Sequence, residues 1–217
     1  MGWVRTFYQS TIGKKIVMAL TGIILVGFVA GHMAGNLLVF KGPEAMNAYA
    51  ELLKSSGALL WTVRLVLLAS VGLHIHAAWT LTLLNRAARP ARYDRQVRQS
   101  STLSALSLRV GGVLLLVFVV FHLLHLTVGS AHPAFSATDA YNNVLIGFSV
   151  PAVAAFYVLA MVALGLHLHH GVWSLFQTLG WNHPHVNPAR RRLAAVLAVV
   201  ISVGFASIPL AIVFQFV

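Results

Sequence analysis

Five long apolar stretches dominate this sequence and decide what it can fold into. A helix that crosses a hydrocarbon layer of about 30 Å needs about 20 apolar residues, and lipid offers no hydrogen-bond partner to an unpaired backbone group. Spanning helices are therefore predicted over residues 16–40, 59–84, 106–128, 147–176 and 193–217. We expect an all-α integral membrane protein that forms a single domain over residues 1–217.

The charged residues predict the orientation of these helices. Only 9% of the chain is charged, and the net charge of +11 would suggest a nucleic-acid partner in a soluble protein. Here the cations gather before the first span, within residues 85–109 and within residues 190–192, which are alternate ends of the spans. The positive-inside rule then predicts an inner-membrane protein with its N-terminus in the cytoplasm and its C-terminus outside, without a nucleic-acid partner.

Histidine is unusually frequent inside the predicted spans. The spans contain His32, His74, His76, His122, His125, His167, His169 and His170. An ionisable group within a bilayer is costly, and neutral imidazole is a ready ligand of haem iron. A single such histidine is more readily explained by a hydrogen bond to a neighbouring helix, so the haem prediction depends on the whole set. The chain has no cysteine, so any haem must be bound noncovalently.

Depth along the spans separates four of the histidines into two levels. Counted from the nearest cytoplasmic polar residue at about 1.5 Å per residue, His32 and His122 lie roughly 25 and 20 Å deep. By the same count, His74 and His167 lie roughly 18 and 15 Å deep. Two levels on four helices predict two stacked bis-histidine haems in a four-helix bundle. The first span would pair with the third and the second with the fourth, leaving the fifth peripheral.

Spacing alone leaves two of these ligands ambiguous. His125 lies three residues after His122, and His170 lies three residues after His167. Residues three apart share a helix face, so either member of each pair is a candidate ligand.

Several short motifs are specific when they occur together. They are Ser10-Thr-Ile-Gly-Lys-Lys15, His32-Met-Ala-Gly-Asn36, Asn85-Arg-Ala-Ala-Arg89-Pro, Arg109-Val-Gly-Gly and His167-Leu-His-His-Gly-Val-Trp-Ser174. With these motifs the chain resembles the di-haem cytochrome b membrane anchor of succinate:quinone oxidoreductases, in its single-subunit, five-helix form. The resemblance covers nearly the whole length.

The resemblance implies a ligand set and a role. It selects His32, His74, His122 and His167 as axial ligands of two haems b, paired as His32 with His122 and His74 with His167. It also implies a flavoprotein partner that oxidises succinate to fumarate and an iron–sulfur partner. This chain would pass electrons from the iron–sulfur subunit to a membrane quinone, with menaquinone favoured. A stand-alone transmembrane di-haem electron carrier is the alternative.

Three further residues are candidates for contacts with quinone. Ser10 and Lys14 are similar in spacing to a quinone-binding serine and basic residue of two-subunit anchors in this superfamily. Arg64 lies just inside the outer end of the second span, where it could pair with a haem propionate, serve a quinone or extend to the interface. Gly165 replaces an acidic residue that some fumarate-reducing relatives use for proton movement, so that proton route is not expected here.

Overall fold

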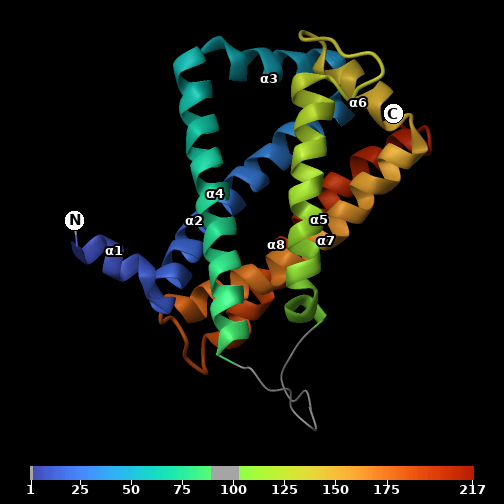
Figure 1. Cartoon of the computed structure of the whole chain (residues 1–217). Helices are drawn as coiled ribbons and strands as arrows, with labels where there is room; N and C mark the ends of the chain where they lie inside the picture. The colour runs from blue at the N-terminus through green and yellow to red at the C-terminus, as the bar shows by residue number, and fades with distance from the viewer. Residues whose placement is uncertain (1, 89–102) are drawn as a thin grey trace.

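The computed structural model describes residues 2–88 and 103–217, which fold into helices joined by short turns, with no β-strand in these two ranges (Figure 1). The elements are α1 (Gly2–Gln9), α2 (Thr11–Asn36), η1 (Leu37–Lys41), α3 (Pro43–Ser55), α4 (Gly57–Ala87), α5 (Leu103–Leu123), η2 (Leu124–Val128), α6 (Ala140–Phe148), α7 (Pro151–Thr178) and α8 (Asn187–Val213). Arg89, Arg92, Arg95 and Arg98 of the predicted cytoplasmic stretch lie outside the described residues.

Five segments are long and apolar enough to cross a membrane. They are Thr11–Lys41, Gly57–Ala87, Ser107–Val128, Pro151–Thr178 and Asn187–Val213. The prediction of an all-α protein with five transmembrane helices is therefore confirmed.

Most helix boundaries differ by a few residues from the sequence-based prediction, and two of the differences show how a helix begins or ends. The fourth span begins at Pro151 rather than Gly147, because Val150 is extended, as is usual for a residue before proline. Gly147 and the residue after it belong instead to the short helix α6. The fifth span ends at Val213, and the last four residues leave the helix.

The short helices and the connections lie at two opposite ends of the molecule. Figure 1 shows α3 and α6 together at one end, and the α1–α2 junction, the C-terminus of α4 and the α7–α8 connection at the other. The second end carries Lys14, Arg86 and Arg190–Arg192. This arrangement agrees with the alternation of cationic ends on which the predicted orientation depends.

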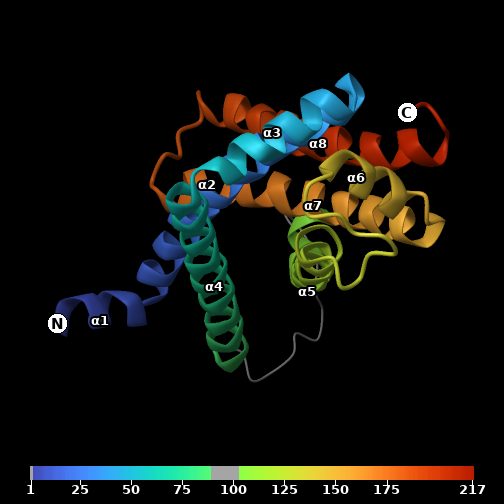
Figure 2. The same cartoon turned by 90° about the horizontal axis from the view of Figure 1, so that it is seen from above.

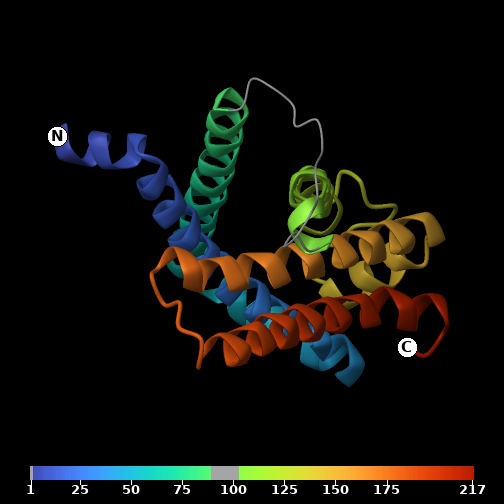
Figure 3. The same cartoon turned by 90° about the horizontal axis from the view of Figure 1, so that it is seen from below.

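Helices α7 and α8 form the best-packed part of the structure and run side by side (Figure 3). Leu168, Ala198 and Ile201 form a buried cluster between them, packed against side chains of α2. Helix α8 has no histidine, as the sequence shows, yet it contributes much of this core. Helix α4 packs mainly against α2, with α3 at one end, and stands apart from α5 (Figures 1 and 2).

A hydrogen-bonded cluster ties α3 to α6 at the end opposite the cationic residues. The Asn47 amide donates to Asp139 Oδ1 over 3.0 Å, and the Asn142 backbone N–H donates to the same oxygen over 3.1 Å. The Tyr141 backbone N–H donates to the Asn47 side-chain oxygen over 3.0 Å. The hydrogen bonds that Asp139 accepts, led by that of the Asn142 backbone N–H and followed by those of the Asn142 and Asn47 side chains, lower the pKa of Asp139.

This cluster predicts that acid will loosen α6. Because the pKa of Asp139 is depressed by folding, its stabilising effect is present above the ordinary aspartate value of about 3.9 and is lost as pH falls through the folded value. The protection factor of the α6 amides, which corrects their exchange rates for the intrinsic effect of pH, should therefore fall on acidification. In Asp139→Asn the protection factor should already be low at neutral pH and change less with acid. An equal acid response in both proteins would contradict this assignment.

Candidate functional site

The structure brings His32 of α2 and His122 of α5 together in the apolar interior. Their ring centroids lie 5.9 Å apart and the ring planes are turned by 80°. Phe28, one helical turn before His32, stacks on the His32 ring, and Phe205 of α8 lies 5.8 Å from it. These aromatic rings surround the pair with apolar surface.

A second pair joins α4 to α7. The ring centroids of His74 and His167 lie 6.2 Å apart, with an angle of 54° between the planes. These two pairings are the ones that depth favoured in the sequence, and the role of the four residues as haem ligands remains a prediction.

The spacing of both pairs fits an iron atom held between two imidazoles. Iron–nitrogen bonds of about 2.0 Å on each side, as in other metal–imidazole bonds, place the ring centres roughly 6 Å apart. The measured spacings of 5.9 and 6.2 Å agree with this value. In the described residues there is no cluster of three or more His, Cys, Asp or Glu side chains that could hold a metal ion. Each pair offers two imidazoles, the number of axial ligands that a bis-histidine haem would need.

Thr21 assigns the tautomer of His74. The Thr21 hydroxyl donates to the Val17 carbonyl one turn earlier over 2.8 Å and lies 3.1 Å from Nδ1 of His74. Because its proton is used by Val17, the hydroxyl oxygen accepts from the His74 Nδ1–H. Nε2 of His74 then keeps a free lone pair, as an iron ligand must.

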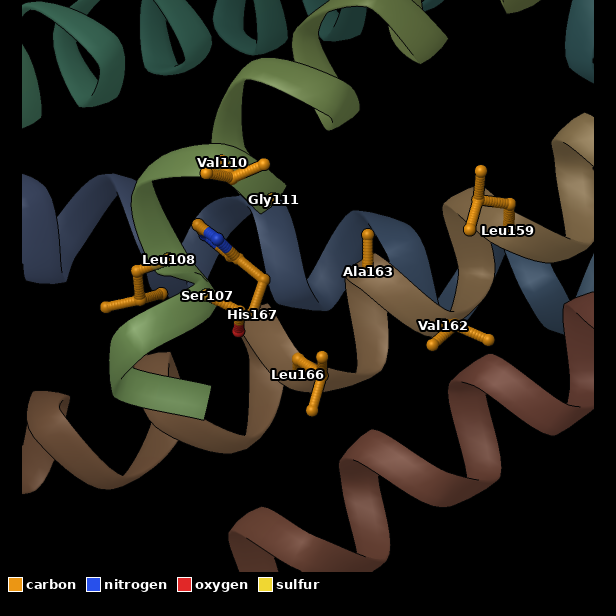
Figure 4. Close-up of a pocket in the computed structure, with 9 residues that line it drawn as sticks. All are labelled: Ser107, Leu108, Val110, Gly111, Leu159, Val162, Ala163, Leu166 and His167. Atoms are coloured by element: carbon orange, nitrogen blue, oxygen red, sulfur yellow. The ribbon is translucent and has the colours of Figure 1, made fainter. Parts of the chain in front are cut away.

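A small cavity of about 200 Å³ lies beside His167, between α5 and α7 (Figure 4). Its walls are almost entirely apolar and include Gly111 and Ala163. In Figure 4 the His167 side chain extends from α7 towards α5. Nδ1 of His167 is buried and has no hydrogen-bond partner among the described residues.

The two alternative ligands are placed differently from their neighbours. His125 is fully buried and its Nδ1 lies 3.0 Å from the Tyr157 hydroxyl. His170 is half-buried on α7. The described ring contacts join neither of them to a histidine of α2 or α4 in the way that they join His122 and His167.

The sequence model of the succinate dehydrogenase/fumarate reductase transmembrane subunit family matches residues 82–206, more than half of the chain. This chain belongs to that family. It is also 27% identical over 201 residues to the succinate dehydrogenase cytochrome b558 subunit of Bacillus subtilis (strain 168), an alignment that covers 92% of this chain and 94% of the relative. No solved structure matches it. The family resemblance stated from the sequence motifs is thus confirmed, and the chain is a multi-pass transmembrane subunit of an oxidoreductase complex.

In this family member, Ser10 and Lys14 hold the junction between α1 and α2. Ser10 Oγ accepts from the Gly13 N–H over 2.9 Å and donates to the Phe7 carbonyl over 2.7 Å. The Lys14 ammonium is buried and donates to the carbonyls of Tyr8 and Gln9 over 3.0 and 2.8 Å. A quinone contact at these residues would have to share groups that already cap the two helices.

This arrangement predicts a structural effect of Lys14→Met. The change leaves the last carbonyls of α1 without their charged donor, at a cost of about 1–3 kcal/mol. We expect faster hydrogen exchange in α1, whereas Lys15→Met, at an exposed neighbour, should leave exchange unchanged. A raised KM for quinone with unchanged exchange would instead identify Lys14 as a quinone contact.

Arg64 is exposed on α4, and its described contact is with an aromatic ring. Its guanidinium lies 5.1 Å from the centre of the Trp61 ring, which is itself 59% exposed. A cation stacked on an exposed tryptophan is typical of the membrane–water interface. This placement favours the interfacial interpretation of Arg64 over a role beside either histidine pair.

Sequence reasoning missed Thr21 and Tyr157, which supply hydroxyls to the candidate ligands. Tyr157 Oη lies 3.2 Å from Nδ1 of His122. The available signal was a polar hydroxyl within an apolar run, since metal-binding histidines usually donate their second N–H to such a group. Nothing in the spacing, however, indicated which hydroxyl faces which histidine.

Proposed function

We propose that this chain is the di-haem cytochrome b anchor of a succinate:quinone oxidoreductase. In this role one haem b is held by His32 with His122 and a second by His74 with His167. The observation that carries the proposal is the spacing of the two ring pairs, 5.9 and 6.2 Å, in a member of this family. Bound haem would supply one-electron redox chemistry at two levels between an iron–sulfur subunit and a membrane quinone.

At these two sites the residues of the chain would bind the haems and orient the histidine ligands. Thr21 holds His74 with Nε2 unprotonated, and Phe28 and Phe205 exclude water from the ring of His32. The four imidazoles come from four separate helices, so haem ligation would depend on the folding of the whole bundle. The anchor itself performs no chemistry on succinate, which belongs to a flavoprotein partner.

The two levels would provide a path for electrons across the membrane. With the N-terminus in the cytoplasm, the iron–sulfur partner docks at the cationic end and a quinone is reduced nearer the opposite end. Menaquinone is the acceptor favoured by this arrangement, because protons taken up outside let the membrane potential assist an otherwise unfavourable oxidation of succinate. The relative from Bacillus subtilis, named as a cytochrome b558 of succinate dehydrogenase, supports the haem assignment.

Purification of the tagged chain from its own membranes tests this function. We expect flavin-containing and iron–sulfur subunits to co-purify, two haems b per chain, and succinate-dependent reduction of a menaquinone analogue. A chain that purifies alone, with two haems reducible by a small soluble donor, would instead support the stand-alone carrier. A colourless assembled complex would overturn the proposal.

A further inference from the structure

A buried hydroxyl connects the two neighbouring histidines of the third span. The Tyr157 hydroxyl of α7 lies 3.2 Å from Nδ1 of His122 and 3.0 Å from Nδ1 of His125. Tyr157 is 6% exposed and His125 is fully buried. The α-helix changes to a π-helical turn, η2, between the two histidines. Such turns are frequent at functional sites.

Because the Tyr157 hydroxyl has a single proton, it must form different hydrogen bonds with His122 and His125. A phenol donates one hydrogen bond, so it gives its proton to one Nδ1 and accepts from the other. When both rings are neutral, one histidine is protonated on Nδ1 and the other on Nε2. Only the ring with its proton on Nδ1 has a free Nε2 lone pair for iron.

The proposed ligation decides which histidine this is, because an iron ligand needs a free Nε2 lone pair and so carries its proton on Nδ1. His122 faces His32, whereas Nε2 of His125 is enclosed next to Gly147 and His132. His132 offers His125 no acceptor, because its Nε2 bonds the Asn143 carbonyl over 2.8 Å and its Nδ1 accepts from the Ala134 N–H over 3.0 Å. With His122 as the ligand, Nε2 of His125 carries a proton that has no acceptor in the described part of the chain, a cost that ligation of iron by His122 has to exceed.

We propose that Tyr157 is a positioning residue for the His32/His122 site. Its hydroxyl accepts from the His122 Nδ1–H and donates to Nδ1 of His125, which holds His122 in the tautomer that presents Nε2 towards His32. This inference rests on the proposed function, because it concerns a ligand of the haem at that site. It also gives a chemical reason, besides its position, why His125 does not compete for the iron.

The hydrogen bond from His122 to Tyr157 is expected to affect the reduction potential of the haem iron. Donation from Nδ1–H makes an imidazole a more basic ligand, which favours the oxidised iron. Its loss in Tyr157→Phe should favour reduction about fivefold, the size of one typical hydrogen bond. For a one-electron couple at 59 mV per tenfold, this is a rise of about 40 mV in midpoint potential.

A redox titration of the intact complex, followed in the haem absorption bands, tests the proposal. Tyr157→Phe keeps the ring that packs against Phe118 and Phe148, so both haems should remain bound. One haem should shift upward and the other should not. Tyr141→Phe, whose described hydrogen bond involves only its backbone, is the matched control and should shift neither.

A double variant separates a direct link from a general disturbance. His125→Ala alone should shift the same haem upward by a smaller amount, because the hydroxyl loses its acceptor and becomes a weaker acceptor itself. In the Tyr157→Phe background it should add nothing. Equal shifts in both backgrounds, or unchanged potentials in a di-haem Tyr157→Phe complex, would overturn this inference alone. Absence of haem from the wild-type complex would overturn the proposed function instead.

Discussion

The His167→Ala complex is expected to contain one haem b per chain where the wild type contains two. The substitution removes one axial ligand of the site shared with His74, and no other described histidine ring lies within the same distance of His74. Loss of one ligand from a noncovalent bis-histidine site removes the attachment on that side entirely. Haem quantified against protein, together with a reduced-minus-oxidised spectrum, measures the outcome.

His170→Ala is the matched control, because His170 lies on the same helix and three residues away. It should retain both haems, as should His125→Ala, since neither ring is paired across the bundle. Loss of a haem in His170→Ala, or retention of both in His167→Ala, would indicate that the ligand lies one helical turn away from His167 and would contradict the assignment. A result in which neither variant loses haem would remove this site from the proposal.

A methyl group at Gly165 is expected to destabilise the packing of α7 against α8. A Cβ at this position would lie 2.7 Å from Ser202 Oγ and 3.4 Å from Ser202 Cβ. Overpacking of this kind costs about 1–3 kcal/mol. Gly165→Ala should therefore lower the unfolding temperature of the purified complex. Gly112→Ala, where an added Cβ meets nothing within 4 Å, should not.

Removal of the opposing hydroxyl should reverse this loss. In Gly165→Ala with Ser202→Ala the closest contact is gone, so stability should recover towards that of the Ser202→Ala variant. If the double variant is no more stable than Gly165→Ala, the contact with Ser202 is not the cause. The same crowding explains why a longer acidic side chain has no room at this position in this family member.

The spanning helices and the histidine levels were predictable because each follows from a count along one helix. Length and hydropathy identify a span without any knowledge of its neighbours, and a rise per residue places His32 and His122 at similar depths. The pairing of spans followed from those depths, and the described ring contacts show the same pairs.

Counting residues along a single helix could not predict the contacts between helices. The hydroxyl of Tyr157 meets two histidines of α5 and η2 only because of the rotation of α7, which no single span reveals. The amphipathic helix α1 and the short helices α3 and α6 also went unpredicted, because they are too short or too polar for the length criterion that finds spans. Lys14 was interpreted through its spacing from Ser10, whereas its burial against the end of α1 depends on that unpredicted helix.

The packing of α4 has a consequence for the order in which the proposed haem ligands would bind. Helix α4 packs mainly against α2 and contributes nothing to the buried cluster of Leu168, Ala198 and Ile201. With haem bound as proposed, His74 is the ligand on a helix that lies outside this core. We therefore expect His74 to be the last of the four ligands to engage.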